Sequence, residues 1–174
     1  AMAPEVQAAD FYWVQVRQMD DYPDGYYDEY GHFTSQKPYD YDYNEYIHYS
    51  DGVVTLHNCH GRLLTCDSVE GLDSLTIVLE GDNSFKQIRS DIPVVIKGTG
   101  TLTLTMHVTT LGPGLEVPEL TIKGGVVKCD ILETTKHNRG ITIDGGALEA
   151  KKIDMRADCF IDLEAGNLTV ENNR

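Results

Sequence analysis

Val94-Val95-Ile96-Lys97-Gly98 and Leu120-Thr121-Ile122-Lys123-Gly124 are two copies of one pattern, and this pattern decides the fold of the chain. Two later segments repeat it: Ile141-Thr142-Ile143-Asp144-Gly145 and Ile161-Asp162-Leu163-Glu164-Ala165. The third positions of the four segments are separated by 26, 21 and 20 residues. Repetition at such a spacing is typical of solenoid proteins, in which each repeat forms one structural unit.

The aligned segments form columns of like residues. A glycine follows each segment, and a second alternating run comes after it. Because successive side chains of a strand point to opposite faces, the apolar columns are expected inside and the mostly polar columns between them outside. The four apolar columns are Val94, Leu120, Ile141 and Ile161; Ile96, Ile122, Ile143 and Leu163; Leu102, Val127, Leu148 and Leu168; and Leu104, Cys129, Ala150 and Val170.

The sequence therefore predicts an all-β fold, a parallel β-solenoid of short coils. A single coil cannot bury its inward face, but stacked coils bury these faces against each other. An antiparallel β-sandwich also has short alternating strands, yet its strands do not repeat one triplet and one glycine at a fixed spacing. Residues 53–56 and 75–81 look like two earlier, less regular coils.

The chain divides into regions of unlike composition. All 10 tyrosines and the single tryptophan, Trp13, precede residue 50. We interpret residues 1–3 as a cloning remnant, residues 4–49 as an aromatic, acidic N-terminal segment and residues 50–174 as the parallel β-helix. Since a solenoid exposes strand edges and apolar side chains at its ends, residues 4–49 are expected to form a Tyr/Asp-rich cap.

Charge and hydropathy limit the classes of partner. The net charge is −14, from 28 acidic and 14 basic side chains. Such a field repels phosphate backbones, so nucleic acid is not expected as a partner. No run approaches the roughly 18 apolar residues of a membrane span, and membrane insertion is not expected either. Cations, or neutral sugars held by carboxylates, fit this charge better.

The repeats resemble the β-helical carbohydrate-binding-domain proteins of bacterial cell surfaces. The resemblance covers about residues 49–172 and is carried by Tyr49-Ser50-Asp51-Gly52-Val53-Val54-Thr55-Leu56-His57-Asn58 and by residues 75–85, 94–104, 120–129 and 141–150. It implies a right-handed β-helix that is secreted or displayed on the bacterial surface, often carries calcium and in some members binds polysaccharide. Residues 22–46 have no counterpart in that pattern.

The N-terminal segment contains the candidate ligand-binding residues. Tyr39-Asp40-Tyr41-Asp42-Tyr43 alternates strictly, so a strand would present three phenol rings on one face and two carboxylates on the other. Aromatic rings stack on the apolar faces of sugars, and carboxylates accept their hydroxyl hydrogens. We therefore expect glycan contact at Tyr39, Tyr41, Tyr43, Tyr26, Tyr27 and Tyr30. The same residues also suit the cap, and one segment can serve both purposes.

Acidic residues in the same segment are candidate calcium ligands. Ca²⁺ prefers several hard oxygen donors, and Asp24, Asp28, Asp40 and Asp42 supply them, although their spacing is not that of an EF-hand. Asp82 and Asn83, in a coil turn, form another possible ligand pair. Cys129 lies in an apolar column and is expected to be a buried free thiol that packs as a small hydrophobe.

These patterns favour a non-catalytic, secreted or cell-surface polysaccharide-binding module, and calcium is a candidate to assist its binding. The outward columns contain Thr, Lys, Glu and Asp without convergence, and no nucleophile or zinc-hydrolase motif is present, so an enzyme is not expected. The alternative is a structural or adhesive β-helical stalk, or a protein-interaction module without a small ligand. A glycan screen would separate these functions.

Overall fold

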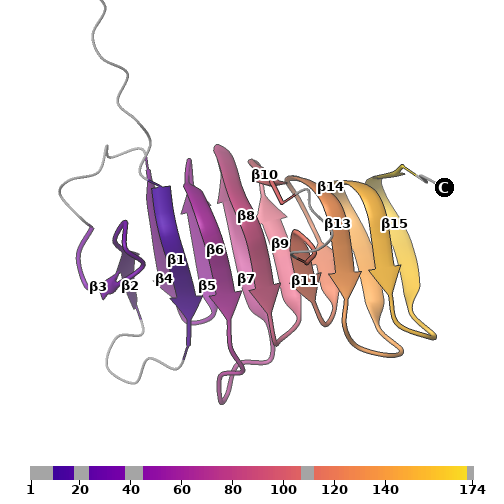
Figure 1. Ribbon diagram of the computed structural model, residues 1–174, viewed down its shortest axis with the longest axis horizontal. Coiled ribbons are helices and arrows are strands. Elements are labelled where there is room, and N and C mark those ends of the chain that lie inside the picture. The colour runs from indigo at the N-terminus through magenta and orange to yellow at the C-terminus, as the bar shows by residue number, and fades with distance from the viewer. Residues whose placement is uncertain (1–9, 18–23, 38–44, 107–111, 172–174) are drawn as a thin grey trace, which may run out of the picture.

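The computed structural model describes residues 10–17, 24–37, 45–106 and 112–171. Over these residues every regular element is a β-strand, and the strands join in one 15-stranded sheet. The sheet winds into a parallel β-solenoid of about five turns (Figure 1). The fold class predicted from the repeats is confirmed.

Each coil has three straight segments, which stack on those of the neighbouring coils to form three sides. The first side contains β5 (Val53–His57), β7 (Leu75–Glu80), β9 (Val94–Gly98), β12 (Leu120–Ile122) and the beginnings of β14 (Gly140–Met155) and β15 (Phe160–Val170). The second and third sides are formed by β6 (His60–Cys66), β8 (Asp82–Ser90) and β13 (Val126–Thr134), each of which bends across both. The rest of β14 continues across both sides, and the rest of β15 lies on the second side. In the middle coil β10 (Thr101–Leu104) and β11 (Leu115–Val117) divide these two sides between them.

Strand register brings the predicted columns together. Ile96, Ile122, Ile143 and Leu163 are Cα partners across β9, β12, β14 and β15. The first three are 0% exposed, whereas Thr142 beside Ile143 is half-buried on the outer face. Each fully buried Ile or Leu contributes roughly 1.5–3 kcal/mol, so the columns are the main source of stability.

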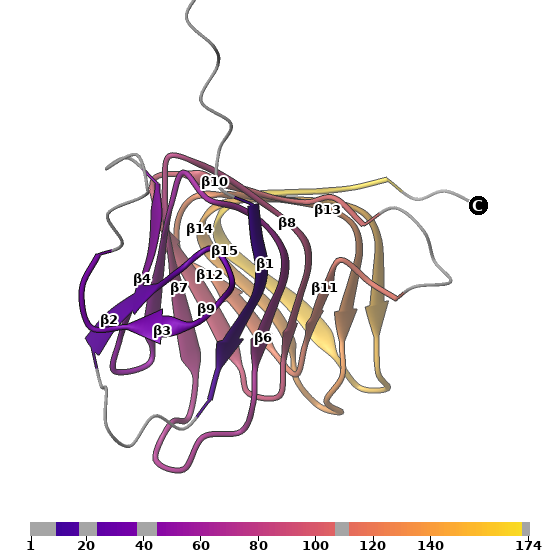
Figure 2. The same ribbon diagram turned by 60° about the vertical axis from the view of Figure 1, so that its left-hand side comes forward.

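The N-terminal strands close one end of the core. β1 (Asp10–Val16) pairs in parallel with β6, and β4 (Tyr46–Ser50) pairs antiparallel with β5. The antiparallel strands β2 (Asp24–Tyr27) and β3 (Phe33–Thr34) continue from β4 and lie across this end (Figure 2). Phe33 makes edge contacts with Tyr27 and Tyr49 at centroid distances of 5.6 and 6.4 Å. These described residues lie over the end of the core where the aromatic cap was expected.

Asn83 holds the corner between the first and second sides. Its side chain is 0% exposed, and its Oδ1 accepts a hydrogen bond from the Cys59 amide at 2.7 Å. Its Nδ2 donates to the carbonyls of Glu80 and Thr101 at 3.2 and 3.3 Å. The prediction that Asp82 and Asn83 form a cation-binding pair is wrong, because the Asn83 side chain points into the core and its amide is used by the backbone.

Candidate functional site

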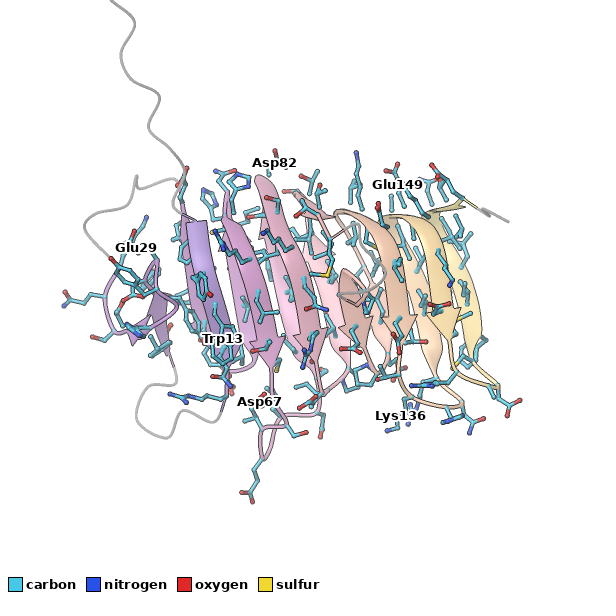
Figure 3. All side chains as sticks on the ribbon, in the orientation of Figure 1. Trp13, Glu29, Asp67, Asp82, Lys136 and Glu149 are labelled. Atoms are coloured by element: carbon cyan, nitrogen blue, oxygen red, sulfur yellow. The ribbon has the colours of Figure 1, made fainter. Side chains whose placement is uncertain are left out.

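Exposed aromatic side chains gather near the N-terminal end of the solenoid. Tyr12 and Trp13 on β1 are 64% and 44% exposed, and they lie with Arg62 and Leu63 of β6 around a shallow hollow of about 200 Å³. We call these four residues the aromatic corner. Figure 3 shows Trp13 on the side of the solenoid formed by β1 and β6.

The aromatic corner exists because β1 bends from the second side to the third. Phe11 and Val14 are both 0% exposed, so the two residues between them point outward together. A regular strand would turn one of the two inward. The bend therefore places a phenol and an indole side by side on the surface.

Hydrogen bonding fixes the indole of Trp13. Its Nε1 donates to Thr65 Oγ1 at 3.0 Å, and Trp13 and Leu63 are Cα partners in the β1–β6 pairing. The guanidinium carbon of Arg62 lies 5.4 Å from the centroid of the Tyr12 ring. A cation at this distance is attracted to the ring face and helps to order both side chains.

Polar groups flank the corner along the third side. Gln15 Nε2 donates to Asp67 Oδ2 at 2.8 Å, and the Gln15 side-chain oxygen Oε1 and the second Asp67 oxygen have no role in that bond. The Tyr12 amide donates to the Glu29 carbonyl at 3.2 Å and thereby fixes β1 to the turn after β2. An apolar platform with a hydroxyl, an amide and a carboxylate beside it is suited to a polyhydroxylated ligand.

A second group of rings, the tyrosine–histidine surface, lies on the first side and consists of Tyr26, Tyr46, His48 and His57. Tyr46 and His57 stack at 4.7 Å with 10° between their planes, and Lys37 Nζ lies 4.4 Å from the centroid of the Tyr46 ring. Tyr26 is 4.9 Å from His48. These rings mainly contact one another, so their faces are less available to a ligand than those of the aromatic corner.

Carboxylates complete the tyrosine–histidine surface. His57 Nδ1 lies 2.8 Å from Glu80 Oε2, and His48 Nε2 lies 2.5 Å from Asp24 Oδ1. Partial burial, followed by the nearby Glu80 charge, raises the pKa of the Tyr46 phenol. The phenol therefore stays neutral over the physiological pH range and serves as a hydrogen-bonding group.

The structure separates the predicted ligand-binding tyrosines. Tyr26 is in the tyrosine–histidine surface, and Tyr30 is 67% exposed in the turn between β2 and β3. Tyr27 requires a correction, because it is 1% exposed and donates its hydroxyl to the Gln15 carbonyl at 3.0 Å. Desolvation by burial raises the pKa of its phenol above the ordinary value. Tyr39, Tyr41 and Tyr43 lie outside the described residues.

The two described candidates for calcium do not share a site. Asp24 lies at the start of β2 against His48, while Asp28 follows the end of that strand and accepts the amides of Tyr30 and His32 at 3.0 and 2.8 Å. Four residues of extended chain place the Cα atoms of the two residues roughly 13 Å apart. Across the described ranges no group of three or more His, Cys, Asp and Glu side chains has a metal-binding arrangement. Asp40 and Asp42 lie outside the described residues.

All four cysteines are free thiols. Cys129 is 6% exposed between Leu104 and Ala150 of neighbouring coils, so the prediction of a buried thiol is confirmed. Burial raises its pKa to about 12. Cys59 is 0% exposed and donates to the Tyr46 carbonyl at 2.8 Å, which ties the cap to the first full coil.

Sequence reasoning did not select the residues of the aromatic corner. A signal for Trp13 was present, because Val14 and Val16 alternate as inward residues and therefore turn Trp13 and Gln15 outward. No comparable signal existed for Arg62, whose place beside Tyr12 depends on the parallel pairing of β1 with β6.

Comparison with known proteins gives no relative, since no family model, no curated protein and no solved structure matches this chain. In the part of the chain that the structure describes, no helix is long and apolar enough to cross a membrane.

Proposed function

We propose that this protein is a non-catalytic polysaccharide-binding module of a secreted or cell-surface protein, and that the aromatic corner is its contact surface. The observation that carries the proposal is the exposed, hydrogen-bonded indole of Trp13 beside Tyr12 and Arg62. The resemblance of the coils to β-helical carbohydrate-binding-domain proteins of bacterial cell surfaces supports the same function.

The chemistry of the aromatic corner suits a sugar ring. A pyranose presents a face of C–H groups that packs on an indole, while its hydroxyls require hydrogen-bonding partners at the edge. Thr65, Gln15 and Asp67 supply such groups along the third side. Because the Trp13 ring is already fixed by Thr65, binding costs less side-chain entropy than it would for a free indole.

The shape of the corner supports binding rather than catalysis. Its hollow is shallow and open, and it is formed by two adjacent strands of a rigid sheet. Such a surface accommodates one segment of a long chain but does not exclude water from a reacting bond. The net charge of −14 disfavours nucleic acid as the ligand. Assistance by calcium remains a prediction from Asp24, Asp28, Asp40 and Asp42.

The proposal is tested by affinity electrophoresis against a panel of soluble polysaccharides, followed by calorimetry on any that retard the protein. Trp13→Ala is expected to weaken binding about tenfold, equivalent to about 1.4 kcal/mol, and Trp13→Phe to weaken it less. Phe160→Ala is the matched control, since Phe160 is an exposed aromatic residue (55%) outside the aromatic corner. Repeating each measurement with a calcium chelator tests the calcium prediction. Equal binding by wild type and Trp13→Ala would contradict the proposed site.

A structural or adhesive stalk is the second candidate function. It is favoured by the regular stack of coils, whose outer columns include small polar residues such as Thr121 and Thr142. A stalk spaces or displays another domain and requires no small ligand. Absence of retardation on every polysaccharide, with and without calcium, would favour the stalk over the binding module.

A further inference from the structure

The C-terminal coil leaves its apolar columns uncovered. Ile161, Leu163 and Val170 of β15 are 36%, 52% and 40% exposed. Their column partners one coil earlier are almost fully buried, with Ile143 at 0% and Ala150 at 4%. The inward residues of β15 are therefore packed on one side only.

Backbone edges are open at the same end. Among the described strands β15 pairs only with β14, so its outer edge has unpaired amide and carbonyl groups. Because β15 ends at Val170, no described strand lies beyond the last segment of β14, residues 152–155, and Met155 in that segment is 36% exposed. Open edges next to apolar side chains are a template for pairing with another chain.

We infer that this open coil binds the same coil of a second copy of the chain, in a two-fold, tail-to-tail dimer. The opposite end of a second copy does not fit, because there β2 and β3 lie across the core and Tyr27 fills it.

The rise of the solenoid makes two open ends complementary. A coil climbs about one strand spacing of about 4.8 Å per turn. Heights here are measured along the solenoid axis toward the C-terminal end. The last third-side segment, residues 152–155 of β14, therefore lies about one third of a strand spacing below the first-side part of β15. The second-side part of β15, residues 167–170, lies about one third of a spacing above it. In the dimer, a two-fold axis through the middle of the first side relates the two copies. It places residues 167–170 of each copy over residues 152–155 of the other, at a distance of one full strand spacing. All three sides then gain antiparallel partners together.

The resulting register matches apolar to apolar. When the inward-pointing residues of the two copies lie opposite each other, Ile153 faces Val170 of the second copy and Met155 faces its Leu168. The same register sets Lys152 opposite Glu171, a pair of opposite charges. Each antiparallel pair of this kind contributes roughly 0.2–1 kcal/mol.

Two acidic residues on the first side oppose formation of the dimer. Asp162 and Glu164 lie on the outer face of β15, on either side of Leu163. Around the two-fold axis each of them comes opposite or next to an acidic residue of the other copy. Like charges across a strand pair are destabilising, so the wild-type dimer is expected to be weak and these two acids to control its strength.

Sedimentation velocity over a concentration series at neutral pH tests the inference. Neutral pH is used because the isoelectric point is about 4.6, where unspecific association would interfere. Wild type is expected to show a monomer–dimer equilibrium. Asp162→Asn/Glu164→Gln should lower the dimer dissociation constant at least tenfold, and Leu163→Lys should leave only monomer while circular dichroism confirms the fold.

The matched control is Glu70→Gln/Asp73→Asn, which makes the same change of charge in the exposed turn between β6 and β7 and should leave the equilibrium unchanged. Three outcomes would overturn the inference. They are monomer at every concentration for both wild type and Asp162→Asn/Glu164→Gln, a dimer that survives Leu163→Lys, and species larger than dimers that grow with concentration. The last result would indicate head-to-tail stacking.

Discussion

Trp13 on β1 and Thr65 on β6 are joined by a hydrogen bond of 3.0 Å from the indole Nε1 to the hydroxyl oxygen, 52 residues apart in sequence. The bond connects the cap strand to the first full coil and orients the only indole of the protein on the surface. Because Trp13 is the only tryptophan, its fluorescence reports on this one position.

Thr65→Val is expected to release the indole while keeping the shape of the residue that contacts it. Trp13 should then show red-shifted emission and lower anisotropy, because the ring is 44% exposed and no longer fixed. Thr65→Ser retains the hydroxyl and should resemble wild type. Identical spectra for Thr65→Val and wild type would show that packing alone orients the ring. The thermal midpoint should change little, because an exposed hydrogen bond contributes about 1 kcal/mol or less.

Ile143→Asp and Thr142→Asp test the inside and outside of the coils with adjacent residues. Ile143 is 0% exposed, so a carboxylate there should cost several kcal/mol if it stays ionised. Thr142 faces outward and should tolerate the same change almost without loss. The comparison is made by thermal melting followed by circular dichroism. A similar fall in both midpoints would contradict the assigned faces of β14.

Gly146→Ala should destabilise the solenoid strongly. Gly146 has φ of 66°, and a Cβ there would lie 2.3 Å from the Gly125 carbonyl oxygen of the coil before it. Gly71→Ala is the control for backbone conformation alone, since Gly71 has φ of 82° and no heavy atom within 4 Å of its added Cβ. The control is expected to cost about 1–2 kcal/mol. Gly146→Ala should cost at least about 2 kcal/mol more, since backbone has to move; equal urea midpoints would show that the coils adjust freely.

The cysteines should differ in reactivity. Burial raises the pKa of the Cys129 thiol to about 12, so at pH 8 almost none of it is thiolate, the reactive form. The native protein should therefore be labelled slowly at Cys129 and rapidly after denaturation. Cys159, which is only half-buried, should react first and serves as the internal control. Mass spectrometry after timed quenching gives both rates. Labelling of Cys129 in the native protein as fast as that of Cys159 would be inconsistent with its buried position.

The coils could be predicted from sequence because the residue pattern that specifies each coil is local and is repeated along the chain. Ile122 and Ile143 occupy the same place in successive patterns, and one strand spacing separates them in the structure. The cap was predicted only in outline. Tyr27 and Tyr26 are adjacent and chemically alike, yet one fills the core and the other faces outward, and the antiparallel pairing of β2 with β4 decides which.

The aromatic corner lay beyond sequence reasoning for a related physical reason. Its neighbours, Tyr12 and Arg62, are 50 positions apart and meet because β1 adds to the solenoid in parallel with β6. Nothing in the composition of residues 10–16 distinguishes this pairing from an antiparallel one. Asn83 was misjudged because its polarity suggested solvent, whereas three backbone groups satisfy it inside the core.

Figure 1 places β1 and β15 toward opposite ends of the stack of coils, with each coil hydrogen-bonded only to its neighbours. A tensile force applied between these two ends would act across the ladders between coils rather than along the strands. The hydrogen bonds between coils would then break one after another instead of all at once. The first rupture is expected at one of the two pulled strands, because β1 pairs only with β6 and β15 only with β14 among the described strands. Anchored at both ends, the solenoid would therefore lengthen in steps of about one coil.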